Sequence, residues 1–520
     1  MNIIESFIKN VNKQPQKIAV IFAEEQVSYS ELYIKVRNIA ALLKHNGVKE
    51  GVKVIVLLPN SIEFLVLMLA IADLGAVLVP LSTTLSSEAV KKAAESSDCS
   101  FAVVNSSVIG KIPQDLIPME SVLVIGNKVV DEEKYLRIDD SLTLGESYEL
   151  GMNNINPDSD YILTMTSGST GNPKPIIFSQ KTKINRGIDA CSELYGINSN
   201  DIIIAASPLY HSLGQRLALF PMFIGATSVI LGKFTPKNWL EAVEEHKVSF
   251  TIAVSSHLES ILIEMLNHKY CINSLKTIVS SSALLKPEVK KKCLKYFKCD
   301  FHECYGASEV GIVTNLYPKD NGVKFNSVGK ALPFVDMKIV DENKHEVSPE
   351  TIGEIICKTS TAFSGYYKLP EKTSESVLQG YFYTGDLGKV DLEGYLYFCG
   401  RKKELIIVGG TNVYPGDVEQ VINKCDEIKE CAVIGIDDIY FGEAVVAVLI
   451  PQDGVDKKDA LRAARKMCFS SLADYQQPMV YELLDALPKN ALGKITKHKL
   501  KEQFKNLDPS AKFRAMRGLK

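Results

Sequence analysis

The sequence predicts an α/β protein with a large N-terminal domain, residues 1–400, and a small α+β C-terminal domain, residues 401–520. Up to about residue 325, apolar runs of strand length alternate with helical segments, which is the pattern of doubly wound parallel sheets. From residue 329 to 398 the runs become short and are separated by turn residues, as in a small β-barrel. After residue 401 the chain has apolar strands of its own.

The first elements follow from local patterns. Residues 18–22 and the run around Val27 predict a hairpin. Ser28 with Glu31 forms a capping box before a helix whose apolar side chains recur every three or four positions. Further strands are expected at residues 54–58, 76–79 and 101–104, with helices at 61–73 and 88–96.

A second alternating series predicts a second α/β subdomain before residue 325. Its strands are expected at residues 202–205, 228–231, 251–254 and 277–279, with helices between them, and a separate buried strand is expected at residues 161–165. In the C-terminal domain, strands are expected at 432–435 and 445–449.

Composition limits the class of protein. A chain of 520 residues is too long for one core, and a net charge of -3 gives no basic surface for nucleic acid. The eleven cysteines are scattered without C-x-x-C pairs, which argues against disulfides or a zinc site and for a reducing cytoplasm. Residues 1–17 are charged throughout and lack a signal-peptide core. The most apolar stretch, 64–81, is broken by Asp73 and Gly75, so no membrane span is expected.

One stretch, residues 166–175, combines glycines, hydroxyls and a lysine directly after a predicted buried strand. Glycines let the backbone approach a ligand closely, and amides, hydroxyls and one cation suit a polyphosphate. The Walker A spacing is absent, and a flexible surface loop is the alternative. The candidate phosphate-binding residues are Thr166, Ser167, Gly168, Ser169, Thr170, Gly171 and Lys174.

Two later motifs place an aromatic ring or a carboxylate beside a glycine. Residues 305–309 offer a tyrosine ring that could stack on a base and a glutamate that could hold a metal; a buried ring and a solvated acid are the alternative. Asp386 follows Gly385, and a carboxylate can accept hydrogen bonds from two ribose hydroxyls. A turn aspartate beside glycine is equally ordinary.

In order along the chain, these motifs resemble those of the adenylate-forming (AMP-binding) superfamily, which includes acyl-CoA synthetases, aryl-acid ligases, luciferases and amino-acid adenylation domains. Three further matches are the basic run 400–406, the glycine loop at 409–410 and the Gly-Lys pair 493–494. Two positions depart from the pattern. Pro175 stands where the family has glycine, and Ser308 replaces threonine but keeps the hydroxyl.

The resemblance implies a role for each motif. ATP would lie on the 166–174 loop, with its adenine near Tyr305, Gly306 and Ser308 and its Mg2+ at Glu309. Asp386 and Arg401 would hold the ribose, and Lys403 would be the hinge about which the mobile C-terminal domain turns. Gly409 and Gly410 would line the channel of the coenzyme A thiol, and Lys494 would be catalytic.

The acyl site is also inferred by resemblance. Residues 207–214 are similar to a Pro-x-Phe-His-x-x-Gly pattern of acyl-CoA synthetases, with Tyr210 in place of phenylalanine, which puts the catalytic candidate His211 beside the reacting carboxylate. A core histidine is the alternative. Ser281 and Ser282 fall at a glycine-rich turn of the family's acyl pocket and imply a narrower pocket. Arg216 lies among apolar residues, where we favour a structural contact over a polar or anionic substrate tail.

The resemblance implies ATP-dependent activation of a small carboxylic acid through an acyl-adenylate, then transfer to coenzyme A with release of AMP and pyrophosphate. Amino acids are disfavoured because the aspartate that holds their amine is absent. The alternatives are loading of an acyl carrier protein, luciferase-like oxidation of the adenylate, and a non-catalytic nucleotide-binding protein. The identity of the acid is not predicted, and a homodimer stays open.

Overall fold

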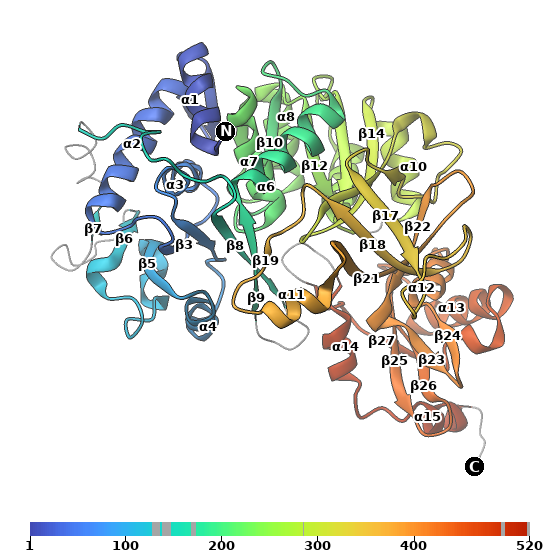
Figure 1. Ribbon diagram of the computed structural model, residues 1–520. Helices are drawn as coiled ribbons and strands as arrows, with labels where there is room; N and C mark the ends of the chain where they lie inside the picture. Colours follow the sequence, from blue (N-terminus) through green and yellow to red (C-terminus); the bar gives the residue numbers. More distant parts are fainter. Residues whose placement is uncertain (127–135, 138–146, 168–172, 284, 490–494, 517–520) are drawn as a thin grey trace. The chain divides into compact units, whose positions relative to one another are not determined.

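The computed structural model describes residues 1–126, 136–137, 147–167, 173–283, 285–489 and 495–516 (Figure 1). The chain forms two compact units. Unit 1 comprises Met1–Phe325, Leu332–Asp336 and Lys358–Phe382, and unit 2 comprises Asn326–Ala331, Met337–Cys357 and Tyr383–Lys520. Unit 2 therefore takes in segments that precede residue 400, and the division into domains at that residue stays a prediction.

Helices begin where the local sequence can satisfy their first amides. Ser28 Oγ accepts from the Glu31 amide at 3.2 Å, and Glu31 Oε2 accepts from the Ser28 amide at 2.8 Å, which confirms the predicted capping box. The helices of unit 1 are α1 (Ile3–Lys13), α2 (Tyr29–His45), α3 (Ile62–Asp73), α4 (Ser87–Ser97), α6 (Gln180–Gly187), α7 (Ser212–Ile224), α8 (Pro236–His246), α9 (Ser255–Asn267), α10 (Pro287–Tyr296) and α11 (Pro370–Ser376).

One large sheet of unit 1 has the order β15-β14-β13-β12-β10-β11-β1-β2. Its strands are β1 (Ile18–Phe22), β2 (Glu25–Ser28), β10 (Ile202–Ala205), β11 (Thr227–Ile230), β12 (Phe250–Val254), β13 (Thr277–Ser281), β14 (Asp300–Ala307) and β15 (Gly311–Leu316). The predicted hairpin β1–β2 is present, but β1 also pairs in parallel with β11, with Val20 opposite Ser228. The N-terminal hairpin thus completes the sheet of the later subdomain.

A second sheet has the order β19-β9-β8-β4-β3-β5-β6-β7. Its strands are β3 (Lys53–Leu57), β4 (Val77–Pro80), β5 (Cys99–Asn105), β6 (Val122–Ile125), β7 (Leu136–Arg137), β8 (Asp160–Ser167), β9 (Pro173–Ser179) and β19 (Gly365–Tyr366). The strands from β8 through β7 in this order are parallel, as predicted, whereas β9 runs antiparallel to β8 and β19 antiparallel to β9. The antiparallel edge brings a segment from residue 365 beside the predicted phosphate loop.

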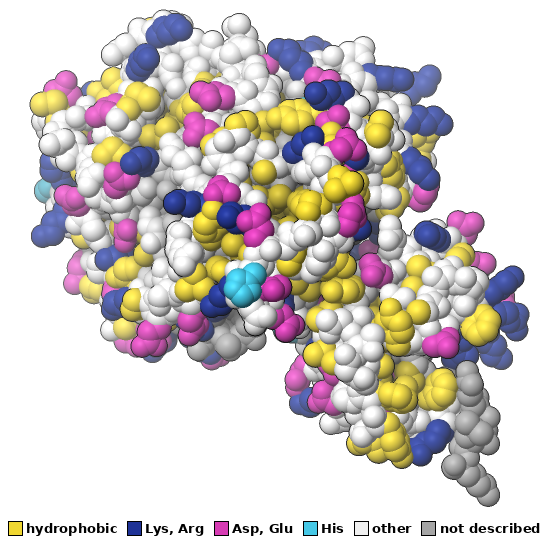
Figure 2. All heavy atoms as spheres, turned by 45° about the vertical axis from the view of Figure 1, so that its right-hand side comes forward, with side chains coloured by type: hydrophobic (Ala, Val, Ile, Leu, Met, Phe, Trp, Pro, Cys, Tyr) yellow, Lys and Arg dark blue, Asp and Glu magenta, His cyan; other side chains and the backbone are white. Residues whose placement is uncertain are grey.

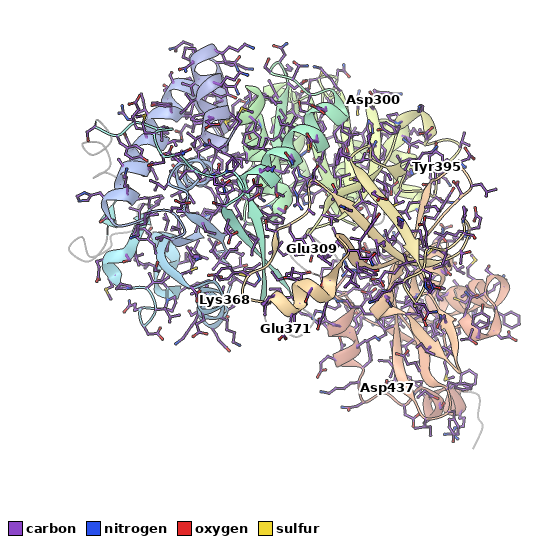
Figure 3. The ribbon with its side chains drawn as sticks, viewed as in Figure 1. Asp300, Glu309, Lys368, Glu371, Tyr395 and Asp437 are labelled. Atoms are coloured by element: carbon purple, nitrogen blue, oxygen red, sulfur yellow. The ribbon has the colours of Figure 1, made fainter. Side chains whose placement is uncertain are left out.

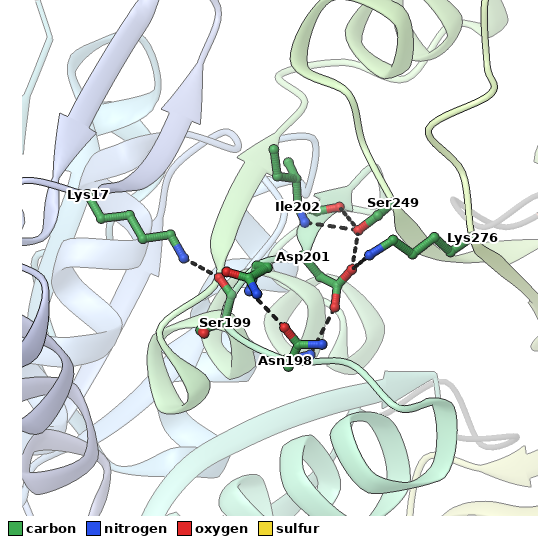
Figure 4. Close-up of polar contacts among 8 residues, drawn as sticks. Lys17, Asn198, Ser199, Asp201, Ile202, Ser249 and Lys276 are labelled. Carbon is green, nitrogen blue, oxygen red and sulfur yellow. Dashed lines mark hydrogen bonds and ion pairs between the residues drawn. The ribbon is translucent and has the colours of Figure 1, made fainter.

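A buried carboxylate joins the starts of three parallel strands (Figure 4). Asp201 accepts from Ser249 Oγ at 2.9 Å, from Lys276 Nζ at 2.7 Å and from the Asn198 amide at 2.9 Å. Although burial opposes ionisation, these hydrogen bonds hold the pKa of Asp201 below its ordinary value. The ionised Asp201 carboxylate therefore holds together the amino ends of these parallel strands, on the side of the sheet opposite to their carboxyl ends.

Residues 335–401 include a five-stranded sheet of order β17-β18-β21-β20, with β22 paired to β21. The strands of this sheet are β17 (Val335–Val340), β18 (Gly353–Thr359), β20 (Val377–Leu378), β21 (Tyr381–Val390) and β22 (Leu396–Arg401). The two-residue strand β16 (Lys330–Ala331) precedes it in the chain. This is the part of the chain in which the sequence predicted short strands and turns.

The C-terminal part of unit 2 is built on the long antiparallel pair β25–β26. Val418 of α12 and Ala460 of α13 pack in one core cluster with strand residues, and Leu500 of α14 packs in another. The elements are β23 (Ile406–Val408), β24 (Thr411–Val413), α12 (Pro415–Ile422), β25 (Ile428–Asp438), β26 (Gly442–Pro451), α13 (Lys457–Ser471), β27 (Val480–Leu483), α14 (Lys497–Gln503) and α15 (Pro509–Met516).

The surface mixes charges of both signs. Lysine and arginine side chains are interspersed with aspartate and glutamate over the face shown in Figure 2. Within the described ranges, no helix combines the length and apolar character needed to cross a membrane.

Candidate active site

The predicted phosphate loop joins two antiparallel strands. Thr166 pairs with Lys174, and Ser167 pairs with Pro173, so residues 168–172 connect β8 to β9. The candidates Gly168, Ser169, Thr170 and Gly171 lie outside the described residues. The Lys174 ammonium lies 5.9 Å from the centre of the Tyr366 ring, so β19 contributes an aromatic neighbour that sequence reasoning missed.

Strand β14 carries the predicted adenine motif to a tight turn. Tyr305 is buried, and the β14–β15 register shifts between Tyr305 and Gly306. A Cβ at Gly306 would lie 2.0 Å from the Gly311 carbonyl oxygen, so only glycine fits there. The ring and the turn are therefore fixed by the hairpin itself.

The turn after β14 is held by a buried arginine that no motif indicated. Arg186 is 1% exposed, and its Nη2 donates to the carbonyl oxygens of Ser308 and Glu309, each at 3.0 Å. Its Nε donates to the Thr361 carbonyl oxygen at 2.8 Å. Arg186 thus ties α6 to the segment that presents Glu309, which is labelled in Figure 3.

Among the described residues, the Tyr366 hydroxyl is the hydrogen-bond partner of the Glu309 carboxylate and donates to Oε1 at 3.1 Å. Burial, with the Glu309 charge and its hydrogen bond, raises the pKa of Tyr366, so this hydroxyl keeps its proton at neutral pH. Among the described residues, no group of three or more histidine, cysteine or acidic side chains could hold a metal by itself. A Mg2+ that arrives with polyphosphate needs only one or two protein carboxylates, and a single oriented Glu309 fits that requirement.

The two predicted ribose contacts lie side by side in unit 2. Asp386 on β21 is opposite Arg401 on β22, and Arg401 Nε lies 3.3 Å from Asp386 Oδ1. The Asp386 amide donates to Thr384 Oγ1 at 3.0 Å. The carboxylate is therefore oriented by its neighbours in the strand pair.

The hinge and thiol-channel candidates are exposed. Lys403 lies in a short 3-10 turn after β22. Gly409 and Gly410 form the β23–β24 turn with φ of +55° and +82°, and a Cβ on either would meet nothing within 4 Å. The Gly409 amide donates to the Phe441 carbonyl oxygen at 2.8 Å. Lys494 lies outside the described residues.

The predicted acyl-site histidine immediately precedes α7. Its ring centre lies 4.4 Å from that of Tyr210, and burial lowers the pKa of His211 to about 4, so the imidazole is neutral at physiological pH. His211 Nε2 is buried with no hydrogen-bond partner among the described residues. At Gly214 a Cβ would lie 2.2 Å from the Pro208 carbonyl oxygen, which explains the glycine of this motif.

The serine pair lies where β13 ends. Ser282 has a φ of +74°, a left-handed conformation that glycine adopts without strain. Burial raises the pKa of the Cys304 thiol on β14 to about 11, against the effect of a hydrogen bond with Ser281. Ser281 therefore contacts the strand that carries Tyr305, and its place in the acyl pocket stays a prediction.

Comparison with known families matches both parts of the chain. A model described as AMP-binding enzyme matches residues 7–367, and one described as AMP-binding enzyme C-terminal domain matches residues 417–494. The chain belongs to the AMP-binding enzyme family. The predicted superfamily is thereby confirmed.

Similar proteins in this family extend over nearly the whole chain. The indoleacetate–CoA ligase of Aromatoleum aromaticum is 28% identical, over 96% of this chain and 98% of its own. The long-chain-fatty-acid–CoA ligase of Bacillus subtilis is 29% identical, over 94% and 92%. Among solved structures, the o-succinylbenzoate CoA synthetase of Bacillus subtilis in complex with its acyl-adenylate intermediate has a TM-score of 0.83 at 27% identity, covering 95% of this chain and 97% of its own. The predicted α/β fold is confirmed by this likeness.

Proposed function

We propose that this AMP-binding enzyme is an ATP-dependent carboxylic acid:CoA ligase that forms AMP. The observation that carries the proposal is the full-length likeness to ligases that join acids to coenzyme A. The oriented pair Asp386–Arg401 and the neutral His211 give the chain suitable contacts for a ribose and for a substrate carboxylate.

In the first half-reaction, a carboxylate oxygen of the acid attacks the α-phosphorus of ATP. A new C–O–P linkage forms, and the bond from the α-phosphorus to the leaving pyrophosphate breaks. Tyr305 lies against adenine, and Asp386 accepts hydrogen bonds from ribose hydroxyls. Negative charge spreads over phosphoryl oxygens, where Lys494 and the hydroxyls of Ser167, Ser169 and Thr170 stabilise it.

Glu309 holds the Mg2+ of MgATP in this proposal. When bound, Mg2+ neutralises charge on the phosphate oxygens. The chain's own part is to orient the carboxylate: the Tyr366 hydroxyl fixes Oε1, and Arg186 fixes the backbone of residues 308–309.

In the second half-reaction, the thiolate of coenzyme A attacks the acyl carbon, a thioester forms and AMP leaves with the bonding electrons. Gly409 and Gly410 suit a passage for the slender pantetheine arm, because no side chain lies within 4 Å of where their Cβ atoms would be. Lys403 is the proposed hinge between the two half-reactions. None of the eleven cysteines, all of which lie in the described part of the chain, forms a disulfide, which supports work in a reducing cytoplasm.

The test is acid-dependent pyrophosphate release over a panel of carboxylic acids, with free coenzyme A or a holo acyl carrier protein as acceptor. We expect release of pyrophosphate together with thioester formation on free coenzyme A. Thioester formation only on the carrier protein would move the proposal to the carrier-loading alternative, and no release with any acid would overturn it.

A further inference from the structure

A cluster of three cations, two of them buried and one half-buried, lies between α6 and α7, which pack side by side (Figure 1). Lys183 and Arg186 are 5% and 1% exposed, and Arg216 faces them from α7. A small cavity lies between the two helices. It is lined by Lys183, Arg186, Ser212, Gln215 and Arg216 with apolar residues of α7.

The positive charges of the cluster have few carboxylates near them. Within the described residues, Lys183, Arg186 and Arg216 form no ion pair with a carboxylate, although the Glu309 charge acts on Arg186. Lys183 donates to Gln215 Oε1 at 2.6 Å and lies 4.4 Å from the centre of the Phe178 ring, while Arg186 donates to carbonyl oxygens and to Ser212 Oγ. Burial, with the charges of Arg186 and Arg216, lowers the pKa of Lys183 well below its usual value. Buried charges without a counterion are costly.

The start of α7 also has buried donors with nothing to donate to. Arg216 Nε and Gln215 Nε2 are buried with no hydrogen-bond partner in the described part of the chain. Gln215 is 0% exposed, and both residues line the cavity. A buried donor that is left without an acceptor is destabilising. The Arg216 side chain hydrogen-bonds with the Cys191 thiol, which is a structural contact of the kind favoured on sequence grounds, but its Nε atom has no partner among the described residues.

This cluster continues the predicted acyl site. Gln215 and Arg216 stand one helical turn after His211 on α7, and the Gln215 amide donates to the His211 carbonyl oxygen at 3.0 Å. The Arg216 charge also acts on the Cys304 thiol, which hydrogen-bonds with Ser281. Arg216 is therefore near both the histidine and the serine that border the acyl group.

We infer that the acid activated by this enzyme carries a second carboxylate at its distal end, and that Arg216 and Gln215 receive it. This inference rests on the proposed ligase function. A guanidinium can bind both oxygens of a carboxylate through Nε and Nη. The side-chain amide nitrogen of Gln215, Nε2, supplies a further donor. A distal carboxylate supplies both a negative charge beside the cations and acceptors for Arg216 Nε and Gln215 Nε2. A hydrocarbon tail has no acceptor and would leave these two donors buried and unpaired beside it.

The experiment compares matched acids on the wild-type enzyme. Straight-chain monocarboxylic and α,ω-dicarboxylic acids of equal carbon number, and benzoic against isophthalic and terephthalic acid, are assayed by acid-dependent pyrophosphate release. We expect a higher kcat/KM for a dicarboxylic acid than for its partner by roughly 10- to 100-fold, the usual effect of hydrogen bonds to a charged group. Equal or lower values for every dicarboxylic acid would overturn the inference while the ligase function stands. If no acid supports release, the ligase function fails, and the inference falls with it.

Variants test which residue causes the preference for dicarboxylic acids. Arg216→Gln should lose most of this preference, because kcat/KM falls for the dicarboxylic acid alone. Arg216→Lys should retain part of the preference. Lys181→Gln is the matched control, because Lys181 is an exposed cation on α6, the neighbouring helix that carries Lys183 and Arg186, and it pairs with Asp158. The acid preference of this variant should equal that of wild type. An equal loss for both acids in a folded Arg216→Gln variant would make Arg216 structural. If that variant does not fold, calorimetric binding of the two acids to wild type decides: tighter binding of the dicarboxylic acid supports the inference, and equal binding overturns it.

Discussion

Two regions of the molecule handle their polar groups in opposite ways. On the β21–β22 pair of unit 2, Asp386 and Arg401 satisfy one another at 3.3 Å. At the start of α7 in unit 1, nitrogen atoms of His211, Gln215 and Arg216 are buried with no partner among the described residues. A mutually satisfied pair is formed before any ligand arrives, and such a pair can orient a common group such as ribose. Unpaired buried donors are stabilised only when a ligand supplies acceptors, which suits selection of a particular substrate.

The largest effect should separate the two half-reactions. Lys494→Ala should slow adenylate formation by roughly 10²–10³-fold or more, because one charge stabiliser is lost, and should leave thioester formation from supplied acyl-adenylate nearly intact. Gly410→Leu should leave adenylate formation nearly intact and slow thioester formation, because its side chain would block the proposed passage for the thiol. Acid-dependent ATP–pyrophosphate exchange follows the first step, and thiol consumption with synthetic adenylate follows the second.

The structure adds a control for the glycine variant. Gly410 has a φ of +82°, so any side chain strains the turn. Gly410→Ala carries that strain with only a methyl group, and it should impair thioester formation less than leucine does. Equal impairment of both steps by Lys494→Ala in a folded protein would remove its step-specific role.

Within unit 1, Glu309→Gln should weaken the use of MgATP by about 100-fold, because an amide lacks the anionic oxygen that a hard cation prefers. Steady-state kinetics against MgATP concentration measures this. Tyr366→Phe removes only the hydrogen bond to Glu309 Oε1 and should have a smaller effect in the same direction. Unchanged dependence on MgATP in Glu309→Gln would place the metal elsewhere.

The stability of the protein should fall at low pH because of three histidines of unit 1. Burial lowers the pKa of His211, His257 and His302 to about 4 from an ordinary 6.5. The unfolded chain binds these protons first, so stability is complete above the unfolded pKa and falls as pH drops from about 6.5 toward 4, by at most about 3 kcal/mol per histidine. Urea unfolding across this pH range measures the slope. His257→Gln should flatten it, whereas the exposed His345→Gln should not; a pH-independent stability would contradict the burial of these imidazoles.

The smallest effects are expected at the serine pair. Replacing Ser281 and Ser282 with glycine should shift preference toward bulkier acids by about 1–3 kcal/mol. Ser282→Gly alone should raise the free energy of unfolding by about 0.5–1 kcal/mol, because its φ is +74°, whereas Ser282→Ala should not. An identical ranking of acids in wild type and double variant would separate these residues from the pocket.

The sequence by itself determined the local elements and the order of the motifs. The capping box of Ser28 and Glu31, the buried strands and the glycines at 214 and 306 follow from neighbours in sequence or from backbone geometry. The family followed because several motifs occur in one order. These features are readable because helix caps, side-chain periodicity and glycine-dependent turns act over a few residues.

Tertiary structure alone decided which distant segments meet. The hairpin at residues 18–28 joins the sheet of β11, and the strand at 365–366 brings Tyr366 to Glu309. Arg186 gave no sequence signal, since its partners are carbonyl oxygens of residues 308, 309 and 361. Backbone carbonyls occur at every residue, and charge burial depends on what the fold places around a side chain. Long-range pairing therefore leaves no local pattern, and only the folded chain showed that Arg216 Nε is buried without a partner among the described residues.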